Sequence, residues 1–230
     1  MNYDTYLNLG RDNYIHNKYS EALECFQNAY EINKTNEVLN YIGCCYIKLD
    51  DFKKAYNIFD DLTKRTEWER PWFNLGRLYL RSEKYEQALK CFNRAVEISP
   101  SNGDCYFYLG VYYESVDNAA KAIEAYNQAI ALAVNPMDIS DVHLNLGVIY
   151  KKQKKYRDAL AEFSVAYELD GSCLEALYNA AIVFKIGRKY QQALDLFKEV
   201  YSRGMDDNVT KEYINYCMTQ IEGSSKTENE

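Results

Sequence analysis

Residues Glu69 to Asn102 read ERPWFNLGRLYLRSEKYEQALKCFNRAVEISPSN, and this stretch predicts the fold of the whole chain. One face of a first amphipathic helix carries apolar and small residues at helical spacing: Trp72, Leu75, Gly76 and Tyr79. One face of a second helix does the same: Ala88, Phe92 and Ala95. Pro100 ends the second helix because proline cannot continue one. Neither helix can bury its apolar face alone, so the unit needs neighbours, which is typical of a repeat.

The same pattern recurs along the chain. A small residue in the first helix is found at Gly10, Gly43, Gly76, Gly110, Gly147 and Ala181. The alanine of the second helix is found at Ala22, Ala55, Ala88, Ala122, Ala159 and Ala193. An aromatic residue follows each alanine by four residues: Phe26, Phe59, Phe92, Tyr126, Phe163 and Phe197. Six repeats therefore cover residues 3–205.

The residues W-x2-L-G-x2-Y, followed by A-x3-F-x2-A and a proline, resemble the tetratricopeptide repeat, a helix–turn–helix module of about 34 residues. This resemblance implies an all-α fold, a right-handed superhelical α-solenoid of helix–turn–helix repeats. After the six-repeat array we expect a C-terminal capping helix over residues 206–222. Its start is indicated by the N-cap candidates Asp206, Asp207 and Asn208, and its apolar stripe is Val209, Tyr213, Ile214, Cys217 and Ile221. Residues 223–230 are polar, and we expect them to be a disordered tail.

The fourth repeat departs from the pattern in two ways. The spacing to the fifth repeat grows by three residues around 134–138, which predicts either a longer neutral loop or a hinge. Ala119 also replaces the aromatic residue that opens the second helix of the other repeats, so we expect the fourth repeat to be packed less tightly.

Composition excludes several classes of function. The net charge is −7 and the pI is about 5.1, which argues against a sequence-independent grip on nucleic acid. No apolar run is long enough to cross a membrane, and the first residues do not read as a secretion signal. The seven cysteines form no C-x-x-C pair, so we expect reduced packing thiols and a cytoplasmic protein.

The sequence contains no recognisable catalytic motif, and we expect neither an enzyme nor a cofactor. There is no nucleophile elbow, phosphate-binding loop or dinucleotide fingerprint. The two histidines are His16 and His143, and His143 takes the place that Trp72 has in the third repeat. His143 is therefore most simply a packing residue, and no metal site is predicted.

The resemblance implies a binding groove lined by the first helix of each repeat, at repeat positions 2, 5, 6, 9, 12 and 13. Position 6 carries Asn8, Tyr41, Asn74, Tyr108, Asn145 and Asn179. Asparagine is a mediocre helix former, and its amide both donates and accepts hydrogen bonds. Four asparagines in one row can therefore hold the backbone of an extended peptide, as in the asparagine ladder of O-linked N-acetylglucosamine transferase. The alternative is that they are ordinary solvent-exposed polar residues.

Positions 5 and 9 predict what kind of peptide would bind. Position 5 is mostly apolar, with Leu7, Asn40, Phe73, Phe107, Leu144 and Tyr178. These side chains either form exposed apolar pockets or pack between repeats. Arg11 and Arg77 at position 9, and Arg70 at position 2, favour an acidic ligand segment in the first three repeats. Acidic residues at position 2 and basic residues at positions 12 and 13 follow the helix dipole and need no functional explanation. The acidic residues are Asp4, Glu37, Asp104, Asp141 and Glu175, and the basic ones are Lys48, Arg81, Lys151, Lys152 and Lys185.

We therefore predict a protein-binding scaffold that holds a partner peptide in its groove. The predicted peptide-binding residues are Asn8, Arg11, Asn40, Arg70, Phe73, Asn74, Arg77, Phe107, Tyr108, Asn145, Tyr178 and Asn179. The family's carboxylate clamp for chaperone tails is not expected, because no three consecutive repeats supply its lysines and asparagines. The alternative is a structural subunit of a larger assembly, docked through its edges or convex face. The sequence does not define the oligomeric state.

Overall fold

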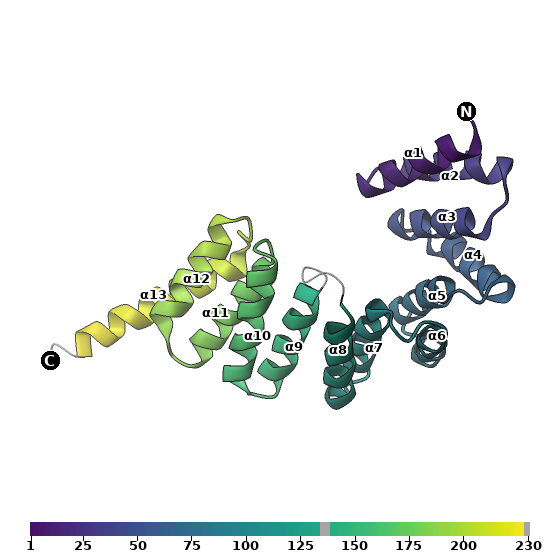
Figure 1. The fold of residues 1–230 in the computed structure, drawn as a ribbon. Helices are drawn as coiled ribbons and strands as arrows, with labels where there is room; N and C mark the ends of the chain where they lie inside the picture. Colours follow the sequence, from purple (N-terminus) through teal and green to yellow (C-terminus); the bar gives the residue numbers. More distant parts are fainter. Residues whose placement is uncertain (134–138, 228–230) are drawn as a thin grey trace. The chain divides into compact units, whose positions relative to one another are not determined.

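The computed structural model of the chain describes residues 1–133 and 139–227. In this part of the chain the regular secondary structure is entirely helical, which confirms the all-α repeat solenoid (Figure 1). The predicted loop or hinge at 134–138 lies outside the described residues. The chain divides into two compact units, Met1–Asn118 and Ala119–Glu230, and the division falls at Ala119 in the fourth repeat.

Unit 1 contains three helical hairpins and one further helix. Its helices are α1 (Tyr3–Ile15), α2 (Tyr19–Ile32), α3 (Asn36–Lys48), α4 (Phe52–Arg65), α5 (Glu69–Arg81), α6 (Tyr85–Ile98) and α7 (Gly103–Ser115). Unit 2 contains α8 (Ala119–Leu132), α9 (Ser140–Lys152), α10 (Tyr156–Leu169), α11 (Leu174–Ile186), α12 (Tyr190–Ser202) and α13 (Asn208–Thr227). The first helices of the repeats are thus α1, α3, α5, α7, α9 and α11.

The two helices of a hairpin approach closely where the repeat has its glycine. A Cβ atom built on Gly76 would lie 2.7 Å from Cε1 of Phe92, which is itself fully buried. Gly10 and Gly43 meet Phe26 and Phe59 in the same way. The glycine therefore lets an aromatic ring of the second helix lie directly against the backbone of the first.

Each hairpin turns through one residue with a left-handed backbone. The φ angles are about +60° at Asn17, Asp50, Glu83, Asp117, Lys154 and Arg188. In the turn between α5 and α6, the backbone N–H of Lys84 then donates to the carbonyl of Tyr79 at 2.9 Å. This hydrogen bond satisfies a carbonyl at the end of the first helix and brings the second helix back along it.

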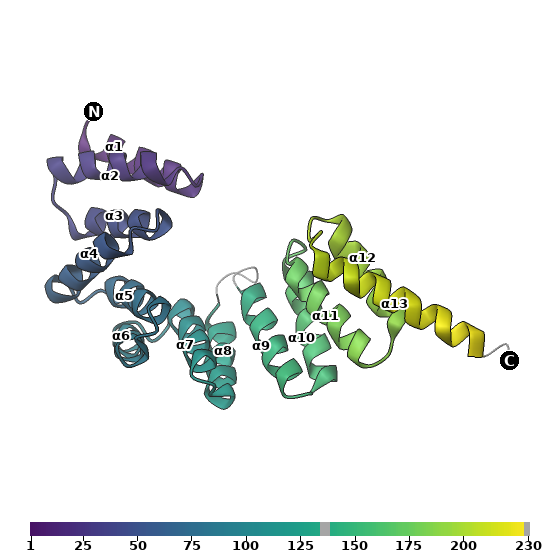
Figure 2. The same ribbon diagram turned by 180° about the vertical axis from the view of Figure 1, so that it is seen from behind.

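The core of each unit is a series of small clusters that join one hairpin to the next first helix. One cluster joins α1 and α2 to α3, another joins α4 to α5 and α6, and two more lie in unit 2. Successive first helices also contact each other, as α3 and α5, α5 and α7, and α9 and α11 do. This stacking places helices that are one repeat apart in the sequence next to each other within each unit (Figures 1 and 2).

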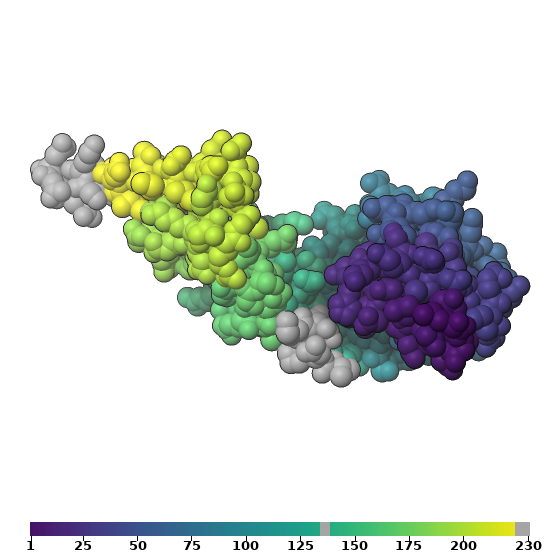
Figure 3. All heavy atoms as spheres, turned by 90° about the horizontal axis from the view of Figure 1, so that it is seen from above, coloured from purple at the N-terminus to yellow at the C-terminus, as the bar shows by residue number. Residues whose placement is uncertain are grey.

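The last helix begins where a seventh repeat would, 34 residues after Leu174, and it packs on α12. Figure 3 shows yellow residues of α13 against the yellow-green residues of α12. Asp207 caps α13, accepting a hydrogen bond from the backbone N–H of Thr210 at 2.8 Å. Cys217 and Thr210 are fully buried, whereas Val209 of the predicted stripe is exposed.

The predicted end of this helix was wrong, because α13 continues through Gly223 to Thr227. Gly223 does not have the positive φ of a helix-ending glycine, and an added Cβ would meet nothing within 4 Å. It is therefore an ordinary helical glycine, which weakens a helix by about 1 kcal/mol without ending it.

Candidate functional site

The four asparagines of the predicted ladder are not equivalent. Two lie in each unit, and of the four only Asn8 is classed as exposed. Asn74 is 5% exposed and donates from Nδ2 to Sγ of Cys44 at 3.6 Å. Asn145 donates to the hydroxyl of Tyr126 at 3.2 Å, and Asn179 donates to the carbonyl of Glu175 at 2.8 Å. Each of these three amides therefore already uses an N–H within the protein, and a peptide would have to use the remaining hydrogen-bonding groups of the amide or replace these contacts.

The position-5 stripe is only partly accessible. Leu7 and Leu144 are buried, and Asn40 is 5% exposed with no hydrogen-bond partner for its buried Oδ1. Asn40, predicted to contact a peptide, thus lies between neighbouring helices and is closed to a ligand in this conformation. Phe73, Phe107 and Tyr178 are half-buried and keep an accessible edge.

The three predicted arginines have different surroundings. Arg11 is 2.6 Å from Glu37, so a carboxylate of the next first helix already pairs with its charge. Arg70 is largely exposed, and its nearest carboxylate belongs to Glu69 at 3.9 Å. Within the described residues, Arg77 has no carboxylate within 4.0 Å.

The Arg77 guanidinium is held by aromatic rings instead of an acid. It lies 4.8 Å from the ring centre of Tyr108 and 5.6 Å from that of Phe73. The Phe73 and Tyr108 rings meet edge to face at 5.2 Å, and Phe107 meets Tyr108 in the same way at 5.1 Å. Such cation–π contacts contribute about 0.5–2 kcal/mol each and leave the N–H groups at the guanidinium edge available to a ligand.

Beside Arg77 is a pocket of about 250 Å³, and its residues come from three successive first helices and the start of α4. Its lining is Ile47, Phe52, Arg77, Leu78, Leu80, Arg81 and Tyr108. The guanidinium of Arg81 lies 4.3 Å from the ring centre of Phe52. It is also 3.8 Å from a carboxylate oxygen of Asp50, and the side chains of Arg81 and Asp50 are both mostly exposed. The pocket therefore combines the guanidinium groups of Arg77 and Arg81 with a lining that is otherwise mostly apolar.

Sequence reasoning missed Arg81, which was assigned to the helix dipole. Phe52 could have indicated the role of Arg81 from the sequence. It starts the second helix of the preceding repeat and therefore faces the end of α5, where Arg81 lies. Close by, burial raises the pKa of the Cys44 thiol to about 11, and the nearby Arg77 and Arg70 only partly oppose this effect. Cys44 is thus an uncharged neighbour of the two arginines.

Unit 2 places one lysine between two first helices and another between α11 and the last helix. Lys151 donates from Nζ to Oδ1 of Asn179 at 2.5 Å, and burial lowers its pKa. The ammonium of Lys185 lies 3.5 Å from the ring centre of Tyr213 in α13. Both lysines had been assigned to the helix dipole. Tyr178, by contrast, packs against Phe197 with ring centres 5.7 Å apart.

Within the described residues, the histidines, cysteines and carboxylates are not grouped as a metal site would require. This part of the chain contains no group of three or more His, Cys, Asp or Glu residues placed to hold a metal ion. His143 Nδ1 is 2.7 Å from a carboxylate oxygen of Glu162, so it links the two helices of its own hairpin. No described helix is long and apolar enough to span a bilayer.

Comparisons with known proteins identify tetratricopeptide repeats in this chain. Three family models, each described as a tetratricopeptide repeat, match residues 70–102, 91–124 and 144–208. The chain is 26% identical over 191 residues to anaphase-promoting complex subunit 3 of Schizosaccharomyces pombe, covering 68% of this chain and 29% of that protein. It is 24% identical over 222 residues to the BBSome complex member BBS4 of Bos taurus, covering 91% and 42%.

A solved structure shows the same fold. A chain in the crystal structure of the APC/C hetero-tetramer Cut9–Hcn1 superposes with a TM-score of 0.85 at 16% identity, covering 94% of this chain and 43% of that one. The chain therefore spans less than half the length of each of these three proteins.

Proposed function

We propose that this chain, which belongs to the tetratricopeptide repeat family, is a non-catalytic adaptor that holds an extended segment of a partner protein against its first helices. A role in protein–protein interaction follows from the family and from relatives that are named as members of protein complexes. Peptide binding in the groove is the more specific part of the proposal.

The observation that carries the proposal is the uncompensated Arg77 beside its pocket. The guanidinium is fixed by Tyr108 and Phe73, so little side-chain freedom is lost when a ligand binds. A guanidinium matches a carboxylate with two parallel hydrogen bonds. The apolar floor beside it suits a hydrophobic side chain. The favoured ligand is therefore an acidic residue next to an apolar one.

The other predicted residues would extend this grip along each unit. In unit 1, Asn8 would hold peptide backbone, Phe107 would supply apolar surface, and the exposed Arg70 would attract a second acid. In unit 2, Asn145 and Asn179 would exchange their present partners for peptide backbone. Arg11 would contribute less, because Glu37 already neutralises it.

A second candidate is a structural subunit of a larger assembly that docks through its edges or convex face. It is favoured by the relatives that are complex members. We propose a cytoplasmic location for either role, supported by seven cysteines that are all free.

A displayed library of random peptides, selected on the purified chain, tests the groove. The selected peptides should be rich in Asp and Glu, and Arg77→Gln should weaken their binding about 10-fold or more, since a charged hydrogen-bonded contact is worth about 1.5–3 kcal/mol. The matched control is Arg94→Gln on α6, where the arginine is exposed and lies 3.0 Å from Glu97. Equal losses in both variants, or selected peptides without acidic residues, would reject Arg77 as the site.

A further inference from the structure

The turns that join the two helices of each hairpin differ in charge between the two units. The residue with positive φ is Asn17, Asp50, Glu83 and Asp117 in the first four repeats, but Lys154 and Arg188 in the last two. The next residue is Lys18, Asp51, Lys84 and Asn118, and then Lys155 and Lys189. Asn and Asp tolerate a left-handed backbone better than Lys and Arg do. The fold itself therefore gives no reason for bases at this position.

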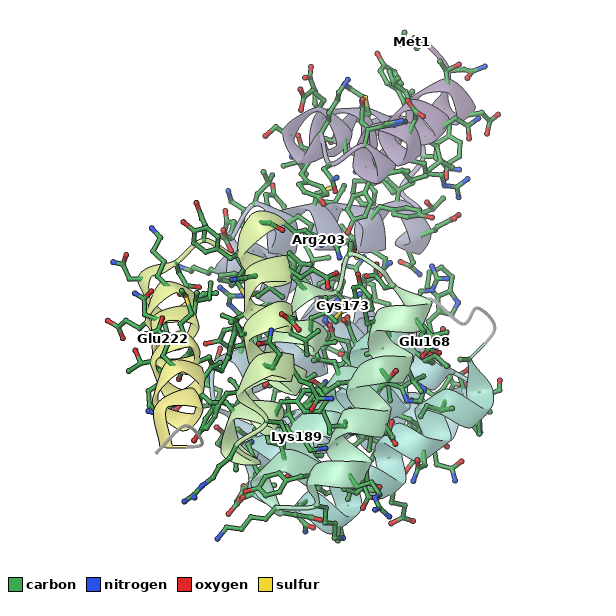
Figure 4. The ribbon with its side chains drawn as sticks, turned by 90° about the vertical axis from the view of Figure 1, so that its left-hand side faces the viewer. Met1, Glu168, Cys173, Lys189, Arg203 and Glu222 are labelled. Atoms are coloured by element: carbon green, nitrogen blue, oxygen red, sulfur yellow. The ribbon has the colours of Figure 1, made fainter. Side chains whose placement is uncertain are left out.

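These turns form one basic edge in unit 2. We use this name for Lys151, Lys154, Lys155, Lys185, Arg188 and Lys189. Because α9 and α11 contact each other, the two turns lie next to one another, and Figures 1 and 2 both show them along the lower side of this unit. Figure 4 labels Lys189 at this end of the hairpins and Arg203 at the opposite end.

The cations of the basic edge form no ion pair within the described residues. In the described part of the chain, none of its six cations lies within 4.0 Å of a carboxylate, although the chain has a net charge of −7. Lys155 and Lys189 instead lie over rings of their own repeats, at 5.7 Å from the centre of Tyr150 and 5.8 Å from that of Phe184. Like charges concentrated in this way repel each other, and an acidic ligand would relieve the repulsion.

A pocket of about 760 Å³ opens beside the basic edge. Lys185 and Arg188 line one part of it, and the tyrosines Tyr190, Tyr213 and Tyr216 supply hydroxyl groups and flat apolar walls. Glu212 on α13 also lines it, so its basic part is the Lys185–Arg188 side. Such a pocket fits a side chain with a carboxylate and some apolar surface.

We propose that the basic edge of unit 2 docks an acidic segment of a partner polypeptide, with one of its side chains in the tyrosine-walled pocket. This surface consists of hairpin turns and the α11–α13 pocket, so it does not depend on the Arg77 groove. A protein segment is favoured over nucleic acid because the cations cover only two turns of an otherwise acidic chain, and the pocket is shaped for a side chain.

The probe is a short fluorescent peptide that alternates Glu and Tyr, compared by fluorescence anisotropy with a peptide that has Gln for Glu. The acidic peptide should bind at least about 10-fold more tightly, and its affinity should fall as salt is added. Weak or equal binding of both peptides would overturn the proposal. Tighter binding of a single-stranded RNA oligonucleotide than of the acidic peptide would also overturn it.

The variant that tests the edge carries Lys154→Glu, Lys155→Asp, Arg188→Glu and Lys189→Asp. These substitutions copy Glu83 and Asp51, which occupy the same turn positions in unit 1, so the hairpins should still form. The control reverses four exposed lysines of unit 1 and changes the net charge equally: Lys18, Lys34, Lys53 and Lys90, each to Glu. The edge variant should lose at least about 10-fold in affinity and the control should not.

Two further variants separate this proposal from the groove. Arg77→Gln disables only the groove, because Arg77 lies in unit 1, so the binding of the Glu/Tyr peptide that remains in this variant should fall at least about 10-fold when the edge substitutions are added. If Arg77→Gln abolishes binding and the edge variant does not, the groove is the acidic site and the edge proposal is wrong. Should the fourfold edge variant lose helicity, Lys154→Glu with Arg188→Glu alone serves as the test, and unchanged affinity in that variant would overturn the proposal.

Discussion

Gly76→Ala tests the close contact that holds the first and second helices together. The new Cβ would lie 2.7 Å from Cε1, 2.8 Å from Cδ1 and 3.1 Å from Cζ of Phe92. The ring has no free direction, because it is fully buried and stacks on Tyr108 with centres 6.2 Å apart. Overpacking of this kind costs about 1–3 kcal/mol. Replacing a helical glycine by alanine gains about 1 kcal/mol, so we expect a net loss of about 0–2 kcal/mol in the free energy of unfolding.

A double-mutant cycle isolates the clash from the helix propensity. Phe92→Val removes every ring atom that the new Cβ would touch, at its own cost of about 2–4 kcal/mol. In that background Gly76→Ala should stabilise the protein by up to about 1 kcal/mol, because only the helix term remains. The sign of the glycine substitution should therefore change with the residue at 92.

Urea unfolding followed by circular dichroism measures all four proteins. The same effect of Gly76→Ala in both backgrounds, within about 0.5 kcal/mol, would refute the close-contact argument. A second readout connects the fold to the site, because Phe92 supports Tyr108 and Tyr108 holds Arg77. Gly76→Ala should therefore also weaken acidic peptides that need Arg77.

Three other predictions concern caps, charge and thiols. Lys84 precedes α6 and makes no side-chain capping hydrogen bond, whereas Asp51 caps α4. Lys84→Asp should therefore raise the free energy of unfolding by about 0.5–1 kcal/mol, measured by urea unfolding, and no gain would contradict this account. Glu37→Gln should release Arg11, costing under about 1 kcal/mol while raising the affinity for acidic peptides; unchanged affinity would show that Arg11 does not face the ligand. Burial raises the pKa of Cys45, Cys91 and Cys105 to about 12 from 9.0. The unfolded chain therefore loses these protons first, and the free energy of unfolding should fall as the pH rises above 9; rising stability there would contradict their burial.

The backbone of this protein could be predicted from a few residue types. Gly76, Ala88 and Phe92 determine how closely two helices approach, and the same close contact recurs at Gly10, Gly43 and Gly147, so the hairpins could be placed from spacing alone. The end of α13 could not be placed this way. Glycine often ends a helix, but the backbone of Gly223 remains helical.

The surroundings of the candidate site residues were harder to predict, because several of these side chains find partners in the next repeat. Arg11 pairs with Glu37, 26 residues later, and Lys151 bonds to Asn179, 28 residues later. The prediction treated each first helix separately, so it classed Glu37 and Lys151 as responses to the helix dipole. Comparing position 9 or 12 of one repeat with position 2 or 6 of the next would have found both contacts from the sequence.

Contacts of this kind also explain why differences between repeats say more about a partner than the shared pattern does. Position 9 carries Arg11, which its neighbour neutralises, and Arg77, which aromatic rings support without neutralising it. The same residue type at the same position is therefore a stabilising contact in one repeat and an available cation in another. Arg11 also lies 5.4 Å from the ring centre of Tyr41, so α3 supplies both a ring and an acid. Among repeats that share one backbone geometry, the ligand preference of a repeat therefore depends on whether the following helix adds an acid to the aromatic ring.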